Sequence, residues 1–134
     1  MAMIPDGLLV YESPHTAAEA MARLIGAITA HGMDVMARID HAKAAKDVGL
    51  DLRPTEVVLF GNPKAGTGLM QASETMGIDL PLRALVWQSD DGTTRLAFAD
   101  PDWLAARHGA KEANGPRLAA MRDALAKLAA AATG

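Results

Sequence analysis

The placement of proline constrains this chain more than any other feature of its sequence. Four of the seven prolines follow a residue whose side chain can cap a helix, either directly or with one residue between. Proline suits the first helical position because its missing N–H would have no partner there, and Ser, Asn and Asp offer oxygen atoms to the free N–H groups of the first turn. The pattern predicts four helix starts, at Ser13-Pro14, Asn62-Pro63, Asp100-Pro101 and Asn114-Gly115-Pro116.

Apolar spacing predicts two long helices, from residue 14 to about 31 and from 116 to about 132. Apolar residues recur every three or four positions from Ala17 to Ile28 and again from Leu118 to Leu128, so each helix has one apolar stripe. A short helix is predicted at 42–48, where Gly49 ends it. We expect one or two further helical turns after Pro63 and a short helix after Pro101.

The intervals between these helices have the composition of strands. Residues 7–12, 33–40, 56–60, 82–88 and 93–99 are short and rich in apolar residues. Positions 33, 35, 37 and 39 are apolar, which predicts a half-buried strand. Residues 56–60 are the most β-branched run and are predicted to be the central strand. The Asp91-Gly92 pair predicts a hairpin between the last two strands.

This order predicts an α+β fold in a single domain covering residues 1–134. The predicted hairpin makes at least part of the sheet antiparallel, and we expect the two long helices to pack on one face. The core would be built from residues 7–110, and the helix at 116–132 would cover it. Only five residues are aromatic, so the core is predicted to be mainly aliphatic.

Composition excludes several classes of function. Thirteen basic and 16 acidic residues give a net charge of −3, which argues against a general nucleic-acid binder. The chain has no cysteine, so thiol catalysis and disulfide scaffolds are excluded. No apolar run is long enough for a membrane span, and residues 1–7 show no targeting signal, which predicts a cytoplasmic protein.

Metal and cofactor binding find little support in the sequence. The four histidines, His15, His31, His41 and His108, are scattered without a metal-ligand spacing. The eight methionines are dispersed, and gap-filling in the core explains them better than soft-metal binding. The sequence therefore predicts neither a metal site nor a cofactor.

Two stretches are unusually dense in polar and special residues. The first follows a predicted strand and runs from Phe60 to Gln71, with Asn62 as a helix cap and Lys64, Gly66 and Thr67 in the first turns. Free N–H groups, a helix dipole, a lysine and a hydroxyl are together suited to an anion. The spacing is not that of a P-loop. The alternative is a well-capped helix in which Gly66 only permits close packing.

The second stretch runs from Asp40 to Thr55. Asp40 and His41 stand at the end of a predicted strand, where a carboxylate could orient an imidazole. The alternative, which we favour, is that Asp40 caps the helix beginning at Ala42. Arg53 could bind the carboxylate of a ligand or form a buried pair with one of three aspartates. Those aspartates are Asp40, Asp79 and Asp100.

The motifs of these stretches closely resemble a bacterial and archaeal family, the domain of unknown function numbered 302. The residues that carry the resemblance are His41-Ala42, Val48-Gly49-Leu50, Leu52-Arg53-Pro54-Thr55, Phe60-Gly61-Asn62-Pro63-Lys64-Ala65-Gly66-Thr67, Asp79-Leu80-Pro81-Leu82-Arg83, Asp100-Pro101 and Arg107-His108-Gly109. The resemblance runs from about Leu9 to Ala132. It implies a TATA-binding-protein-like fold, in which a curved, mainly antiparallel sheet of about five to six strands carries helices on one side. It also implies a homodimer and no established activity.

Three hypotheses follow, in order of preference. The first is a dimeric module that binds a small anionic ligand in a pocket at one end of the sheet. Its predicted ligand-binding residues are His41, Arg53, Asn62, Lys64, Gly66 and Thr67. The second is a structural or interaction homodimer, in which Arg53, Asp79 and Arg83 form buried pairs. The third is an enzyme with His41 as general acid/base, oriented by Asp40 or Asp100, in which Lys64 or Arg53 stabilises negative charge.

Overall fold

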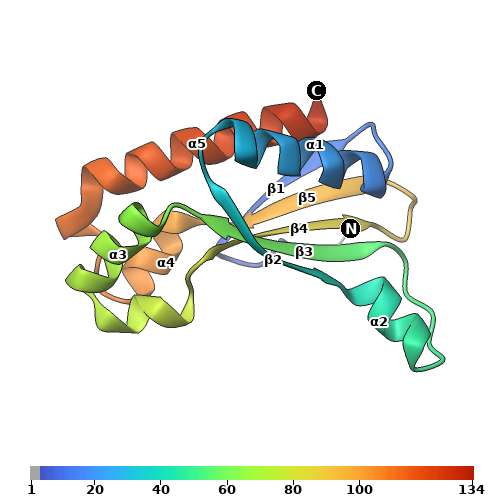
Figure 1. Cartoon of the computed structure of the whole chain (residues 1–134), viewed down its shortest axis with the longest axis horizontal. Coiled ribbons are helices and arrows are strands. Elements are labelled where there is room, and N and C mark those ends of the chain that lie inside the picture. Colours follow the sequence, from blue (N-terminus) through green and yellow to red (C-terminus); the bar gives the residue numbers. More distant parts are fainter. Residues whose placement is uncertain (1–3) are drawn as a thin grey trace.

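The computed structural model describes residues 4–134. Residues 1–3, which belong to the segment without a predicted targeting signal, lie outside the described residues. Five strands form one sheet in the order β1-β5-β4-β3-β2, and every neighbouring pair is antiparallel (Figure 1). The predicted α+β class and antiparallel sheet are therefore confirmed. The strands are β1 (Leu8–Ser13), β2 (Asp34–Asp40), β3 (Thr55–Gly61), β4 (Leu82–Gln88) and β5 (Thr94–Ala99).

The two longest helices, α1 (Ala17–Ala30) and α5 (Gly115–Thr133), lie side by side on one face of the sheet (Figure 1). The shorter helices lie at opposite ends of it. Helix α2 (His41–Asp47) stands at one end, and α3 (Pro63–Ala72) and α4 (Pro101–Arg107) stand at the other. Two 3₁₀ helices, η1 (Glu74–Ile78) and η2 (Glu112–Asn114), complete the second group. Within residues 4–134 no helix is both long and apolar enough to cross a membrane.

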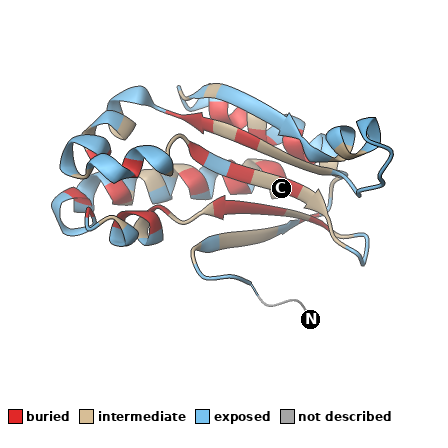
Figure 2. Ribbon diagram, turned by 90° about the horizontal axis from the view of Figure 1, so that it is seen from below, coloured by how far each residue is buried: buried red, intermediate tan, exposed pale blue. Residues whose placement is uncertain are grey.

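The core lies between the sheet and the two long helices. Leu24 and Ile28 of α1 and Leu128 of α5 are fully buried against the sheet. Although the core is mainly aliphatic, as predicted, its largest side chains are Phe60 and Phe98, which meet edge to face with ring centroids 6.4 Å apart. Figure 2 shows that β3, β4 and β5 consist mainly of buried and partly buried positions, whereas β2 is mostly exposed.

The first helix begins later than predicted, at Ala17 instead of Pro14. Thr16 caps it, because its Oγ1 accepts a hydrogen bond from the Glu19 N–H at 3.2 Å. Ser13 instead ends β1 opposite Thr94, and its Oγ donates to the Ala132 carbonyl at 2.9 Å. The Thr-x-x-Glu spacing is typical of a helix start and outweighs the proline signal here.

The predictions for β2 and β3 are wrong, the first in the burial of the strand and the second in its place in the sheet. Strand β2 is mostly exposed because it lies at the edge of the sheet, and a bulge between Val35 and Ala37 breaks its alternation. The central strand is β4, and β3 is second from the edge. The short helix α2 and the β4–β5 hairpin are confirmed, whereas α3 is longer than expected and continues into η1.

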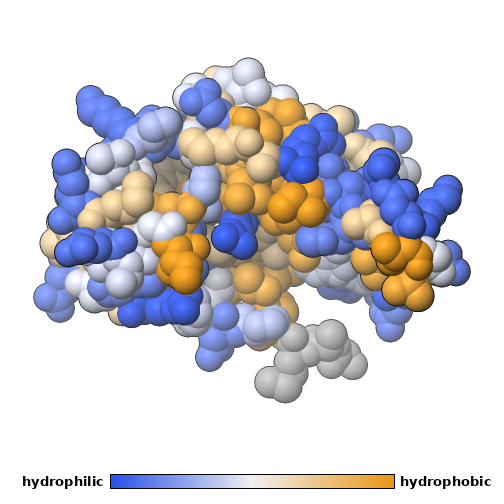
Figure 3. Space-filling model, turned by 60° about the horizontal axis from the view of Figure 1, so that its bottom comes forward, coloured by the Kyte–Doolittle hydropathy of each residue, from blue (hydrophilic) through white to orange (hydrophobic). Residues whose placement is uncertain are grey.

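The two long helices, α1 and α5, cover one face of the sheet and leave the opposite face uncovered. Its middle row is apolar, since the strand registers align Ile39, Val57, Leu85, Ala97 and Val10 across the five strands. Figure 3 shows apolar side chains gathered in the middle of this face. This uncovered apolar row is a surface suited to contact with another protein.

Candidate functional site

The six predicted ligand-binding residues do not come together. His41 and Arg53 lie before β3, while Asn62, Lys64, Gly66 and Thr67 lie after it. A seven-residue strand is about 20 Å long, so β3 holds the two groups that far apart. The prediction of one shared pocket at one end of the sheet is therefore wrong.

The two residues predicted to assist His41 both serve as helix caps, Asp40 at the α2 end of the sheet and Asp100 at the opposite end, where it caps α4. Asp40 Oδ1 accepts the Lys43 N–H at 2.9 Å, and Asp100 Oδ1 accepts the Asp102 N–H at 2.9 Å. Within residues 4–134, the His41 side chain is exposed and forms no hydrogen bond or ion pair. The proposed dyad of His41 with a carboxylate is not formed, and the favoured alternative, Asp40 as the cap of α2, is confirmed.

The buried arginine pairs are also absent from the part of the chain that the structure describes. Arg53 is exposed, and its Nε donates to the Gln88 carbonyl at 3.1 Å rather than to a carboxylate. Arg83 is exposed on the uncovered face of the sheet and has no ion pair. Asp79 pairs with Arg107, with Nη1 and Oδ2 2.9 Å apart.

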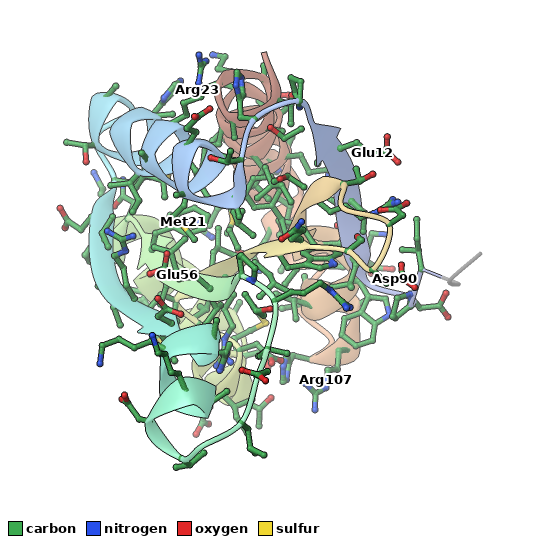
Figure 4. The ribbon with its side chains drawn as sticks, turned by 90° about the vertical axis from the view of Figure 1, so that its right-hand side faces the viewer. Glu12, Met21, Arg23, Glu56, Asp90 and Arg107 are labelled. Atoms are coloured by element: carbon green, nitrogen blue, oxygen red, sulfur yellow. The ribbon has the colours of Figure 1, made fainter. Side chains whose placement is uncertain are left out.

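A wide cleft of about 990 Å³ opens between α1, α2 and the ends of β3 and β4. Figure 4 looks at this end of the molecule, where Met21 of α1 and Glu56 of β3 line the cleft. Lys43 and Lys46 line it as well, so both signs of charge are present. Neither His41 nor Arg53 lines this cleft, so the cleft is not the predicted ligand site.

At the other end, Asn62 caps α3 as predicted, but this cap weakens the expected anion site. Asn62 Oδ1 accepts the Lys64 N–H at 2.9 Å, and Pro63 has no N–H. Two of the first three helical positions therefore offer no free donor to an anion. Lys64 itself is exposed.

A groove of about 620 Å³ lies beside this cap, between α3, α5 and the starts of β2 and β4. Asn62, Gly66 and Thr67 line it, whereas Lys64 does not. Four of the eight methionines in the chain line the same groove, and they are Met33, Met36, Met70 and Met121. Met33 and Met121 also pack against the core, as predicted for gap-fillers, whereas Met36 and Met70 are exposed, so the prediction is wrong for those two. Methionine side chains are flexible and polarizable, and they suit a surface that adapts to its ligand.

Arg117 supplies a fixed cation at the groove. Its guanidinium lies against α3 at Gly68, where a Cβ would come within 2.5 Å of the Arg117 Cζ. Arg117 Nη1 donates to Asn114 Oδ1, and the buried Asn114 donates in turn to the Ala110 carbonyl at 2.7 Å. A buried amide therefore holds the arginine in place, and a glycine makes room for it.

The groove has the chemistry of a small-molecule site. Its volume and largely apolar lining match sites that bury a small ligand, and a few polar groups could fix the ligand's orientation. Arg117 and Lys127 are cationic, and Asp123 is anionic. The residues that the structure describes contain no cluster of three His, Cys, Asp or Glu side chains that could hold a metal ion.

Sequence reasoning missed Arg117 and the methionine lining, because they come from segments distant in sequence. The two stretches singled out for polar density contain Asn62, Thr67 and Met70 but none of the β2 or α5 residues of the groove. One signal was available, since glycine inside a helix is costly and often marks a close approach. Gly68 of α3 is such a residue.

Comparisons with known proteins agree with the fold and leave the groove unassigned. The solved structure of an uncharacterized conserved DUF302 protein from Bacillus stearothermophilus superimposes with a TM-score of 0.74 at 21% identity. It covers 96% of this chain and 97% of that chain, and at this identity the likeness shows the fold alone.

Curated relatives match part of their own length. Proteins named fluoride-specific ion channel FluC 1, from Brucella suis and Brucella abortus, are 47% identical to this chain over 106 residues. The match covers 79% of this chain but only 42% and 39% of those proteins, so the chain spans about two fifths of their length. The model of the family described as "Domain of unknown function DUF302" matches residues 9–132, and the chain belongs to that family.

Proposed function

We propose that this domain is a binding module for a small amphipathic molecule, held in the methionine-lined groove. The carrying observation is that four methionines, an anchored arginine and the capped start of α3 line one cavity. The apolar body of the ligand would lie on the methionines. Its anionic or polar head would lie at Thr67 and Arg117, since a guanidinium binds carboxylates and phosphates through paired hydrogen bonds.

This proposal keeps the small anionic ligand expected from the sequence but changes its site. Asn62, Gly66 and Thr67 stay in the site because they line the groove, and His41 and Arg53 leave it because they lie beyond the far end of β3. Lys64 leaves the site as well, because it does not line the groove.

A thermal-shift comparison of octanoate, octanol and inorganic phosphate tests the proposal. Octanoate should raise the melting temperature most, because it offers both an apolar body and a negative head. A ligand at one hundred times its Kd stabilises a fold by about 2.7 kcal/mol. Arg117→Gln should remove the preference for octanoate over octanol, while Lys64→Gln, a cation outside the groove, should leave it unchanged. Equal shifts for wild type and Met121→Gln with every probe would contradict the proposal.

The relatives named fluoride-specific ion channels suggest a partner for the module. We propose that it acts as a cytoplasmic regulatory domain beside such a channel, and that its groove binds a regulator and not fluoride. A cavity of about 620 Å³ is far larger than a halide ion, and its lining is mostly apolar. Fluoride added to the thermal-shift series should therefore give no shift that depends on Arg117. A fluoride shift lost in Arg117→Gln would contradict this assignment.

A second candidate function, an interaction homodimer, is supported by the uncovered apolar row of the sheet. The row joins Ile39, Val57, Leu85, Ala97 and Val10 through the strand registers. We assign the dimer to this face and keep the TATA-binding-protein-like classification with it, because one antiparallel sheet carries both long helices on its other side. Light scattering should give twice the 14.0 kDa chain mass.

Leu85→Lys should convert that dimer to a monomer, because a charge would lie in the middle of the contact. Leu50→Lys is the matched control, since Leu50 is an exposed leucine (64%) at the α2 end, away from the row. A wild-type chain that is monomeric at micromolar concentration would contradict the dimer and leave the groove proposal standing.

A further inference from the structure

A second polar cluster lies where η1 meets the end of α4, outside the groove. His108 is the first residue after α4, and both of its ring nitrogens are hydrogen bonded. His108 Nε2 lies 2.5 Å from Asp79 Oδ2, and His108 Nδ1 lies 2.8 Å from Thr75 Oγ1. The three residues form a chain of hydroxyl, imidazole and carboxylate.

The carboxylate determines which proton the imidazole carries. An ionised Asp79 only accepts hydrogen bonds, so His108 Nε2 carries the proton and donates it to Oδ2. In the neutral ring, Nδ1 then has a lone pair, which accepts the Thr75 hydroxyl proton. The His108 side chain is only 7% exposed, whereas Thr75 is exposed. The ring is fixed, and the hydroxyl that it faces is open to solvent.

Two other contacts already attach η1 to α4, so the hydrogen bond between Thr75 and His108 is not needed for that attachment. Ser73 Oγ donates to the His108 carbonyl at 2.9 Å and joins the start of η1 to α4. Arg107 Nη1 lies 2.9 Å from Asp79 Oδ2 and joins its end. The bond between Thr75 and the ring is additional to both attachments. Its distances match those of an activated nucleophile, a base and a group that orients the base.

We propose that Thr75 is a nucleophile for acyl transfer, with His108 as its general base and Asp79 as the positioning residue. Thr75 Oγ1 would form a bond to the carbonyl carbon of an activated ester or thioester while its proton moves to His108 Nδ1. The bond to the leaving alkoxide or thiolate breaks, and that group takes the proton from His108. Water, deprotonated by the same ring, then releases the acid and restores the Thr75 hydroxyl.

Reaction of the full chain with p-nitrophenyl acetate tests this proposal. We expect an early release of about one nitrophenolate per chain and an acetyl group located on Thr75 by peptide mass spectrometry. Thr75→Val should abolish the adduct, and Thr75→Ser should retain it. Thr55→Val is the matched control, because Thr55 Oγ1 is hydrogen bonded to the Arg53 carbonyl at 2.8 Å and to no base.

Three outcomes would overturn the proposal. One is an adduct confined to lysines or His108 and equal in wild type and Thr75→Val. Another is the absence of any acetyl adduct in a wild-type chain whose melting temperature shows that it is folded. Thr75→Ser keeps the hydroxyl contact, so loss of the adduct in both Thr75 variants would also count against it.

The role of Asp79 has a separate readout. Asp79→Asn should slow acylation on the order of 10²–10⁴-fold, because the ring would lose the acceptor that fixes its tautomer. Arg122→Gln removes the ion pair with Asp102 of α4, outside this cluster, and should leave the acylation rate unchanged. If both variants lose acylation rate equally, and each loss follows the fall in melting temperature, Asp79 is not a positioning residue.

Discussion

The two ends of β3 lead to regions that differ in how their polar residues are used. At the α2 end, Asp40 caps a helix, and His41 and Arg53 are exposed to solvent. At the α3–α4 end, Arg117 and His108 are held by buried or partly buried partners. The sequence is equally dense in polar motifs on both sides of β3. The density of polar motifs in the sequence therefore does not identify a functional site. Polar side chains held by hydrogen bonds to buried partners are a better indication of one.

Replacing a histidine at each end should give the sharpest contrast. His108→Ala removes two side-chain hydrogen bonds from a ring that is 7% exposed and should lower the free energy of unfolding by about 2 kcal/mol. His41→Ala should change it by less than about 0.5 kcal/mol, because His41 is exposed. Urea denaturation of both variants measures the difference, and equal losses would break the comparison.

A second pair of substitutions compares the polar supports of the two ends. Asn114→Ala removes a buried amide (2% exposed) that bonds Ala110 and Arg117, and it should cost about 1–3 kcal/mol. Asp40→Ala removes a helix cap and should cost about 1 kcal/mol. Asn114→Ala should also weaken octanoate binding, since it frees Arg117. Intact binding in a folded Asn114→Ala would show that the arginine needs no anchor.

Gly68→Ala should separate stability from ligand binding. The new methyl group would meet the Arg117 guanidinium at 2.5 Å, and the flexible arginine would have to move. Alanine favours a helix over glycine by about 1 kcal/mol, which offsets the lost contact, so stability should change little. Octanoate affinity should fall, and Gly26→Ala, with open space around it, is the control. Equal affinity in both variants would remove Arg117 from the binding site.

The smallest expected effect lies in the β4–β5 turn, which is at the α2 end. Hydrogen bonds from Thr93, aided by Arg95, hold the pKa of Asp91 below its usual value. A lowered carboxyl pKa stabilises the fold above the unfolded-state pKa, and this stabilisation is lost as pH falls through the folded-state pKa. NMR titration should therefore show Asp91 staying ionised to lower pH than an aspartate in an unstructured peptide. Because Asp91 is exposed, Asp91→Asn should barely change stability at neutral pH.

Local signals predicted the elements well and their assembly poorly. Capping residues located α3 and α4, and the Asp91-Gly92 pair located the hairpin, since both signals depend on neighbours in the chain. Helix α5 begins at the predicted site, but Asn114 does not cap it, because its side chain bonds Ala110 and Arg117 instead. The position of β3 in the sheet and the exposure of β2 depend on strand order and on a bulge. Neither strand order nor the bulge has a local signature that could have been used.

The candidate site was predictable only in part for the same reason. Asn62 and Thr67 were found because they stand near a helix start, but Arg117 comes from α5 and meets α3 only in the folded chain. Asp79 and His108 were noted as motif residues, yet their contact spans 29 positions. His41 was the candidate base because an aspartate precedes it, and that aspartate is a helix cap, as the favoured alternative predicted.

The methionine lining allows oxidation to change the groove surface from apolar to polar. Met36 is 47% exposed and Met70 is 36% exposed, so oxidants can reach both thioethers. Oxidation would turn these flexible apolar groups into polar sulfoxides, and methionine sulfoxide reductases would restore them. The surface that would hold the body of an apolar ligand is therefore also open to peroxide.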